Sequence, residues 1–500
     1  MYIVHIVSEF APIAKVGGLG DVIYGLSKET SKHKHKVEII IPKYDCIDYG
    51  RLTHLKVENR ELWSFEGHGR YNNTIWSAEV DNLKVTFIEP HHPNFYFSRG
   101  IIYGCPDDCD RFAYFSRAAL EYLYKSEKWP DAIHIHDWPT SLVALLYKEM
   151  YIPLGMRVGG ILLTIHNLEH QGRCPVNVLN QVGLKGEDYL DPEKMQDSTY
   201  PDLINLLKGG IEYSDAINTV SPTYLKEIQT LSGGFGLDDA LKRNQKKLTA
   251  ILNGIDETYW NPQTDPHLVA HYSTKKVNTT DKFTKILKAK AENKRQLRTH
   301  FGLKEEKAPI IGSVTRLVLQ KGTDLIKHAL ERTLEKGGQF ILLGSSPSIE
   351  QEKPFEELHK KLTKNKNVAI CLDQNEALAH LIFAGSDMFI IPSIFEPCGL
   401  TQLIALRYGT VPIVRMTGGL ADTVFDIDTS HRPENVRNGF TFESADTLGV
   451  NEALDRALHC WSKDQKKWHK IMRQGMNVDF SWSQEAPKYF AIYKQLSLSN

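Results

Sequence analysis

The chain has 500 residues, more than one hydrophobic core usually supports, which favours two or more domains. Hydrophobic residues make up 41% and charged residues 24%, as in ordinary globular proteins, and the formal net charge is -1. This balance excludes the basic field that draws proteins to nucleic acid or anionic membranes, so we expect any polymer partner to be neutral.

The cysteines and the apolar runs indicate in which cellular compartment the protein is found. The seven cysteines are scattered, which favours a reducing compartment over a disulfide framework. Cys105 and Cys109 could bridge or bind a metal, but no second pair lies nearby, and we interpret both as free thiols. No basic leader precedes the first apolar run, and no stretch approaches the ~18 uninterrupted apolar residues of a membrane span. We expect a cytoplasmic protein with no membrane partner.

Short apolar, β-branched runs recur along the chain, each followed by a segment with helical periodicity. Runs that are apolar on both faces and alternate with helices are typical of parallel sheets covered on both sides. Such a series occurs twice, so we predict an α/β protein with two doubly wound, Rossmann-like domains facing a cleft. The runs are "YIVHIVS", "KVEIIIP", "DAIHIH", "GGILLTIHN", "DAINTVS" and "LTAILNG", then "APIIGSVTR", "QFILLG", "NVAICL", "DMFIIP", "TVPIVR" and "NGFTF".

Composition and spacing indicate where the domains end. We place the first domain at residues 1–254, with an antiparallel insertion at about 59–89, where apolar runs are too close together for crossover helices. A stretch rich in Pro, Asn, Asp and Thr then opens a second domain at 255–480. We expect the helix at 481–500 to pack back on the first domain.

The loop after the first strand, "FAPIAKVGGLGDV", places glycines beside a lysine. Gly17 and Gly18, close to Lys15, would let backbone amides approach an anion. A dinucleotide fingerprint begins at Gly18, but its third glycine position holds Ile23, and the loop is longer than the tight turn that this fingerprint requires. We therefore favour a different anion.

The segment "IHIHDWPT" places His134 and His136 on one face of a strand that ends at Asp137. A metal site is one alternative, but no third ligand cluster accompanies the two histidines. A helix-capping Asp137 is the second alternative. We favour an Asp137 that faces a ligand.

The segment "LLTIHNLEHQG" places His166 and Asn167 after a wholly apolar strand, with Gln171 in the next loop. A single histidine is more often structural than catalytic, but ligands bind at the carboxyl ends of parallel strands. Both interpretations of His166 stay open at this point.

Two segments of the second domain suit a phosphorylated ligand. Arg316 follows a strand, and Lys321 precedes a helix in "GSVTRLVLQKGTDLI", which suits a phosphate or diphosphate, although both could be solvated surface cations. In "RMTGGLADTV", the turn from Thr417 to Gly419 would offer free amides to a phosphate. The D-x-D pattern at 426–428 lies beyond a helix rather than at a strand end, and we expect no metal there.

The segment "PSIFEPCGLTQ" places Glu396 after a strand, where a carboxylate could accept hydrogen bonds from vicinal hydroxyls. Cys398 has no nearby histidine and is not expected to be a nucleophile. Cations and amides around a cleft would stabilise a departing diphosphate.

A series of segments resembles bacterial and plant glycogen and starch synthases, in the same order, from about residue 3 to residue 442. They are "KVGGLGDV", "HDW", "IHNLEHQG", "TVSPTY", "NGID", "TRLVLQKG", "EPCGLTQL" and "TGGLADTV". The resemblance implies a GT-B glycosyltransferase fold, with the first domain on the acceptor side and the second on the nucleotide-sugar side. It also implies a retaining transferase that moves glucose from ADP-glucose to the non-reducing end of an α-1,4-glucan such as glycogen, without metal or cofactor.

The resemblance also implies roles for residues. Asp137 and His166 would face the sugar, Arg316 and Lys321 would clamp the diphosphate, and Glu396 would hold the donor glucose. The residues implied to bind substrate are Lys15, Gly17, Gly18, Asn167, Gln171, Asn253, Cys398, Gly399, Leu400, Thr417, Gly418 and Gly419.

The sequence departs from the family pattern at two places. Pro139 stands where many members carry His, which removes any role for that side chain. Ile404 occupies the position of a second Glu in the wider superfamily, with Gln402 nearby, so ribose recognition is not assigned to a carboxylate. The alternatives are a UDP-glucose or small-acceptor transferase of the same fold and an inactive glucan-binding homologue.

Overall fold

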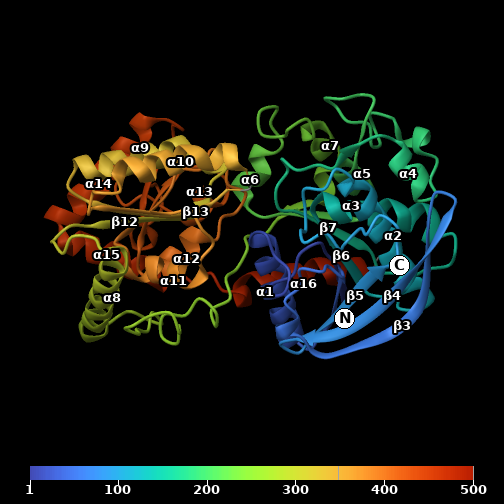
Figure 1. Cartoon of the computed structure of the whole chain (residues 1–500), viewed down its shortest axis with the longest axis horizontal. Helices are drawn as coiled ribbons and strands as arrows, with labels where there is room; N and C mark the ends of the chain where they lie inside the picture. Colours follow the sequence, from blue (N-terminus) through green and yellow to red (C-terminus); the bar gives the residue numbers. More distant parts are fainter. Residues whose placement is uncertain (347, 499–500) are drawn as a thin grey trace. The chain divides into compact units, whose positions relative to one another are not determined.

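The computed structural model describes residues 1–346 and 348–498, which divide into two compact units. Unit 1 comprises Met1–Gly254 and Trp482–Asn500, and unit 2 comprises Ile255–Ser481. Figure 1 colours both units along the sequence. Within the described residues, no helix has the combination of length and apolar character that crossing a membrane demands.

A nine-stranded sheet forms the centre of unit 1, in the order β11-β10-β7-β6-β1-β2-β5-β4-β3. Neighbours from β11 to β5 are parallel, whereas β4 is antiparallel to both β5 and β3. The strands are β1 (Tyr2–Ile6), β2 (Lys36–Pro42), β3 (Thr53–Glu66), β4 (Gly69–Val80), β5 (Leu83–Pro90), β6 (Ala132–His136), β7 (Ile161–Ile165), β10 (Ala216–Thr219) and β11 (Leu248–Ala250). The short strands β8 (Arg173–Cys174) and β9 (Ile204–Asn205) form a separate pair.

The antiparallel ribbon begins at Thr53, earlier than the apolar pattern indicated. The first part of β3 is almost entirely exposed, and its pairing with β4 is interrupted by register shifts before Leu62. A strand exposed on both faces carries no alternation of apolar and polar residues, so periodicity does not detect it.

The helices of unit 1 include a final one contributed by the end of the chain. They are α1 (Gly18–Lys32), α2 (Asp108–Lys125), α3 (Asp137–Leu146), α4 (Asn177–Gln181), α5 (Leu206–Tyr213), α6 (Pro222–Glu227), α7 (Asp238–Arg243) and α16 (Trp482–Ser497). Figure 1 shows α16, in red, beside the blue α1, with which it packs.

Helix α16 completes one of the cores of unit 1. Its buried Trp482, Tyr489 and Tyr493 pack with Ile3 of β1 and with apolar residues of α1 and β6. A Cβ added to Gly25 would lie only 2.0 Å from Nε1 of Trp482, so α1 has a glycine where the indole lies against its backbone. Unit 1 is therefore assembled from segments that are separated by the whole of unit 2.

Unit 2 has a six-stranded parallel sheet in the order β14-β13-β12-β15-β16-β17. The strands are β12 (Ile310–Arg316), β13 (Gln339–Ser345), β14 (Val368–Cys371), β15 (Met388–Ile391), β16 (Val411–Arg415) and β17 (Phe440–Phe442). Numbered within the unit, this is the doubly wound order 3-2-1-4-5-6, which reverses direction between β12 and β15. Ligands of such sheets bind at that switch point, beyond the carboxyl ends of the strands.

Helices cover both faces of this sheet. Figure 1 shows α9, α10 and α14 on one face and α11, α12 and α15 on the other. The helices of unit 2 are α8 (Thr280–Phe301), α9 (Thr323–Glu335), α10 (Ile349–Leu362), α11 (Glu376–Gly385), α12 (Thr401–Arg407), α13 (Gly418–Thr423), α14 (Thr447–Lys463) and α15 (Gln465–Asn477).

The packing of α16 can be tested by truncating its largest buried side chain. We expect Trp482→Ala to lower the free energy of unfolding by about 3–5 kcal/mol, because it removes a buried indole and leaves a cavity beside α1. Leu498→Ala is the control, since Leu498 is 74% exposed. Urea denaturation curves of the two variants measure the difference, and equal midpoints would contradict the packing described.

Candidate active site

A cavity of about 130 Å³ lies in unit 2 at the switch point between β12 and β15. Its polar lining comes from the ends of these strands and the loops that follow them, and it includes Arg316, Lys321, Ser393 and Glu396. The structure thus brings together three residues that lie up to 80 positions apart in the sequence and that were predicted to act on one ligand.

Lys321 and Glu396 form a close ion pair in this cavity. The Lys321 Nζ donates to both carboxylate oxygens of Glu396, at 2.6 and 2.8 Å, and the Ser393 hydroxyl donates to one of them at 2.8 Å. Glu396 is only 5% exposed, and burying a charge without partners costs free energy. The Lys321 ammonium therefore already has a negative partner before any ligand binds.

Gly322 determines where Lys321 can lie. Its φ of 69° is in the left-handed region, and a Cβ at this position would come within 2.2 Å of the carbonyl oxygen of Pro392. Only glycine satisfies both constraints. The close approach brings the end of the β12 loop against the β15 loop that carries Glu396.

Arg316 is the last residue of β12, and its side chain is exposed. No hydrogen bond or ion pair of its guanidinium group is found within residues 1–346 and 348–498. A guanidinium with five unused donors suits bidentate binding of a phosphate.

The turn from Thr417 to Gly419 packs directly against the loop that carries Glu396. The Gly419 amide donates to the carbonyl oxygens of Glu396 and Pro397, at 3.0 and 3.2 Å. A Cβ at Gly418 would lie 1.9 Å from the Glu396 carbonyl oxygen. The prediction that this turn offers free amides to a phosphate is therefore wrong for Gly419, because its amide supports the backbone of Glu396 instead.

Gln402 has a similar supporting role. Its buried side-chain amide donates to the carbonyl oxygens of Cys398 and Gly399, both at 3.0 Å, and so shapes the turn that leads to Leu400. Gly399 has a φ of 72°, and a Cβ there would lie 2.4 Å from the Gln402 amide oxygen. Cys398 is buried, consistent with a packing role for its side chain.

In unit 1, the glycine-rich loop surrounds a carboxylate of the chain itself. Glu9 accepts hydrogen bonds from the amides of Val16, at 2.7 Å, and Gly17, at 3.1 Å, and from the Tyr103 hydroxyl at 2.9 Å. The prediction that the Gly17 amide is available to an external anion is therefore wrong in this structure, because Glu9 occupies it. Glu9 was not predicted from the sequence, although an acid in the loop after the first strand was a visible signal.

Lys15 lies on the wall of a second cavity, of about 480 Å³, that is lined by residues of unit 1. Its ammonium pairs with the exposed Asp21 of α1, with 2.9 Å between Nζ and Oδ1. Exposed pairs of this kind are weak, so Lys15 can exchange Asp21 for a ligand at little cost.

Asp137 begins α3 with a φ of 52°, an unusual conformation for a residue other than glycine. Its Oδ1 accepts the amides of His166, at 2.6 Å, and Asn167, at 3.3 Å, rather than capping its own helix. Burial raises the pKa of the Asp137 carboxyl to about 7, and the negative charge of Glu9 adds to the shift. A strained, poorly solvated acid at a strand end is typical of functional sites.

Gln171 is fully engaged within the protein. Its amide nitrogen donates to the carbonyl oxygens of Leu168 and Phe235, and its oxygen accepts from Arg173 and Asn205. The prediction that Gln171 binds substrate is not supported, because no donor or acceptor of its side chain is left. Asn167 accepts the amide of Glu169 at 3.1 Å, and Asn253 is buried.

Four histidines gather on the sheet of unit 1. His5 lies directly opposite His134 in the register of β1 and β6, and His136 and His166 follow on the same side. The expectation that no third candidate ligand accompanies His134 and His136 is therefore wrong, because His5 stands beside them. Strand pairing that brings distant residues together is not visible in local sequence.

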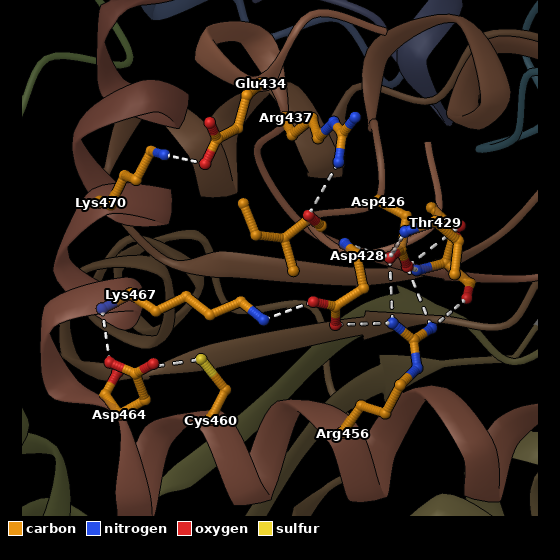
Figure 2. Close-up of polar contacts among 12 residues, drawn as sticks. Asp426, Asp428, Thr429, Glu434, Arg437, Arg456, Cys460, Asp464, Lys467 and Lys470 are labelled. Carbon is orange, nitrogen blue, oxygen red and sulfur yellow. Dashed lines mark hydrogen bonds and ion pairs between the residues drawn. The ribbon is translucent and has the colours of Figure 1, made fainter. Parts of the chain in front are cut away.

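The D-x-D pattern belongs to an ion-pair network away from the cavity of unit 2 (Figure 2). The Arg456 guanidinium of α14 binds both oxygens of the buried Asp426 at 3.0 Å and reaches Asp428 at 3.3 Å. Lys467 of α15 pairs with Asp428, and Lys470 pairs with Glu434. These carboxylates tie the loop after α13 to α14 and α15, which is a structural role.

Comparisons with known proteins agree with this architecture. Residues 2–243 match the model of the starch synthase catalytic domain, and residues 295–475 match that of group 1 glycosyl transferases. A glycogen synthase of Protochlamydia amoebophila (strain UWE25) is 52% identical over 500 residues, which is 100% of both chains. A probable starch synthase 4 of Arabidopsis thaliana is 48% identical over 99% of this chain, which spans 47% of that protein.

A solved structure is similarly close. The catalytic domain of starch synthase IV from Arabidopsis thaliana, bound to ADP and acarbose, is 47% identical and superposes with a TM-score of 0.94 over 99% of each chain. The prediction of two Rossmann-like domains of the GT-B type is confirmed. On these grounds the chain belongs to the glycogen and starch synthase family of glycosyltransferases.

Proposed function

We propose that the protein transfers glucose from ADP-glucose to the non-reducing end of an α-1,4-glucan such as glycogen, with retention of configuration. The names of the relatives and the ADP in the similar starch synthase domain support this donor and acceptor. The observation that carries the proposal is the cavity of unit 2, in which Arg316, Lys321 and Glu396 meet at the switch point of a doubly wound sheet. We further propose that the enzyme works in the cytoplasm without a cofactor.

The cations of this cavity suit a diphosphate leaving group. When the bond between the anomeric carbon and the diphosphate oxygen breaks, negative charge develops on ADP. The Arg316 guanidinium would bind two phosphate oxygens, and the Lys321 ammonium would act as a point charge. Because two fixed cations can neutralise this charge, we propose that the reaction needs no metal ion.

Glu396 would change partners when the donor binds. Its carboxylate is held by Lys321 and Ser393 in the structure described. A diphosphate that draws the Lys321 ammonium towards itself leaves carboxylate lone pairs for the hydroxyls of the donor glucose. The ion pair would thus hold Lys321 and Glu396 in place for two different parts of one substrate.

We assign the glucan acceptor to unit 1. The walls of its cavity are largely uncharged, with Ile13, Ile101 and Tyr103 beside Lys15, which suits a neutral polymer. Asp137 and His166 would contact glucosyl hydroxyls. The hydrogen bonds that the backbone amides of His166 and Asn167 donate to Asp137 hold both segments in one arrangement.

Release of ADP from ADP-glucose tests the proposal directly. We expect release to depend on added glycogen and to continue in the presence of EDTA, and we expect UDP-glucose to be a poorer donor. Release without glycogen, or with a small sugar acceptor only, would favour a different transferase. No release with either nucleotide sugar would favour an inactive glucan-binding protein.

The diphosphate clamp can be tested with Lys321→Ala. We expect turnover to fall by ~10²–10³, as when one preorganised charge is removed from a transition state. The control is Lys327→Ala, because Lys327 lies in α9 nearby and pairs with Asp324 on the surface of the helix. If the turnover of Lys321→Ala stayed within about threefold of the wild type, Lys321 would not be one of the residues that bind the diphosphate.

Lys321→Ala should also be less stable than the wild type, because it leaves the buried Glu396 without its cation. We expect a loss of about 3–5 kcal/mol at neutral pH. Adding Glu396→Gln should restore much of this stability without restoring turnover. The comparison separates the structural role of the ion pair from its proposed chemical role.

The raised pKa of Asp137 predicts how the stability of the protein depends on pH. Since its folded pKa of about 7 lies above the ordinary carboxyl value, the folded protein holds this proton more tightly than the unfolded chain does. The wild type should therefore lose stability as the pH rises from about 4 to 7. Asp137→Asn should remove this loss of stability, because the Asn side-chain oxygen is uncharged and can accept the same hydrogen bonds from the backbone amides.

We expect Asp137→Asn to match the wild type near pH 4 and to exceed it in stability by on the order of 2–4 kcal/mol at pH 8. Asp48→Asn is the control, because the Asp48 carboxylate is 55% exposed. Midpoints of urea denaturation, measured for each variant across this pH range, test the sign of this dependence on pH. A difference between Asp137→Asn and the wild type that does not change with pH would contradict it.

A further inference from the structure

Three imidazoles of unit 1 are joined end to end by hydrogen bonds. The Nδ1 of His5 lies 3.2 Å from Nε2 of His136, and the Nδ1 of His136 lies 3.1 Å from Nε2 of His166. His5 comes from β1, His136 from the end of β6 and His166 from the loop after β7. The chain runs from the buried sheet to a residue proposed to contact the sugar.

Each of these rings is neutral at physiological pH. Burial lowers the pKa of His5 and of His166 to about 3 and holds the pKa of His136 well below its ordinary value. A neutral imidazole carries one proton on its two nitrogens. The three rings therefore share three protons.

The number of protons leaves only two arrangements in which both hydrogen bonds form. Each nitrogen-to-nitrogen contact needs one proton, and the third proton must lie at an end of the chain. It is either on Nδ1 of His166 or on Nε2 of His5, and the choice at one end determines the tautomer of every ring. The state of His166 is thus coupled to the environment of His5.

The environment of His5 favours one arrangement. Its Nε2 is buried and has no hydrogen-bond partner among the described residues. A buried N–H without an acceptor is avoided more strongly than an unused acceptor. The third proton is therefore favoured on Nδ1 of His166, for which no hydrogen bond is found within the described part of the chain.

We propose that His5 and His136 are positioning residues, whose hydrogen-bonded chain holds His166 in the tautomer that presents an N–H at Nδ1. His166 is then a neutral donor suited to a hydroxyl oxygen of a sugar. The inference rests on the proposed function for the identity of that sugar, but the tautomer itself follows from the three rings alone.

His134 belongs to the same cluster but not to the chain. Its two nitrogens bond to the Tyr493 hydroxyl, at 2.8 Å, and to the Thr164 hydroxyl, at 2.7 Å. It therefore provides a matched control for His5. Both are buried, they are direct neighbours in the sheet, and only His5 is hydrogen-bonded to His136.

A metal ion is the competing explanation of the cluster. Ring nitrogens of His5, His134 and His136 lie within 4.8 Å of one another. However, both nitrogens of His134 are bonded to hydroxyl groups, and the facing nitrogens of His5 and His136 are bonded to each other. A metal ion could bind all three rings only by breaking these hydrogen bonds.

Nitrogen NMR of the full-length protein labelled with ¹⁵N-histidine tests the proposal, because the chemical shift separates protonated from bare ring nitrogens. The His166 signals are assigned with a His166→Gln variant. We expect Nδ1 of His166 to be protonated and Nε2 to be bare in the wild type. In His5→Asp, the carboxylate oxygen takes the place of Nδ1 and only accepts, so the proton moves to Nε2 of His136. We therefore expect His5→Asp to reverse the tautomer of His166, and His134→Leu to leave His166 unchanged.

Kinetics give the second readout. We expect His5→Asp to lower kcat by about tenfold with little change in KM, since the N–H donor at Nδ1 of His166 is lost, whereas His134→Leu should lower thermal stability more than kcat. The proposal is overturned by a bare Nδ1 in the wild type, by an unchanged His166 in His5→Asp, or by one equivalent of bound metal. The expected tautomers in a protein that does not turn over ADP-glucose would sustain this inference and refute the proposed function instead.

Discussion

The charge of a buried carboxylate must be compensated, and this constraint on Glu396 organises the candidate site of unit 2. The ammonium of Lys321 meets it, and it can do so only because Gly322 adopts a left-handed conformation against the Pro392 carbonyl. A side chain at Gly322 would separate the two loops and leave Glu396 unpaired. The two segments that look like separate cation and acid motifs in the sequence therefore form one site at the switch point of the sheet. Arg316, beside this pair, supplies a cation that has no partner among the described residues.

In unit 1, two acids are held by backbone amides instead. Glu9 is held by the amides of the glycine-rich loop, and Asp137 by those of His166 and Asn167. The Gly17 amide, which was predicted to be available to an anion, thus already binds a carboxylate of the protein. We therefore assign the proposed stabilisation of the leaving group to side-chain cations rather than to this amide. The amide-bound acids instead keep the loops of unit 1 in a defined arrangement.

The sequence predicted the apolar strands of both sheets and the residues at their carboxyl ends, because buried parallel strands leave a local signal. It predicted neither the first half of β3, which is exposed on both faces, nor the partners of the polar residues. Gln171 looked like a ligand-binding amide until the structure showed its four bonds. His5 was overlooked because its partner His136 is 131 positions away. Hydrogen-bond partners of this kind depend on strand register and loop packing, which no local pattern encodes.

The central claim is that fixed cations of unit 2 hold the departing nucleotide. A crystal structure of the protein with ADP, grown with and without magnesium, tests it most directly. The account predicts that the diphosphate lies within hydrogen-bond distance of both Arg316 and Lys321 in either case, with no ion between them. An ADP that binds away from β12, or that reaches the protein only through a bound cation, would contradict it.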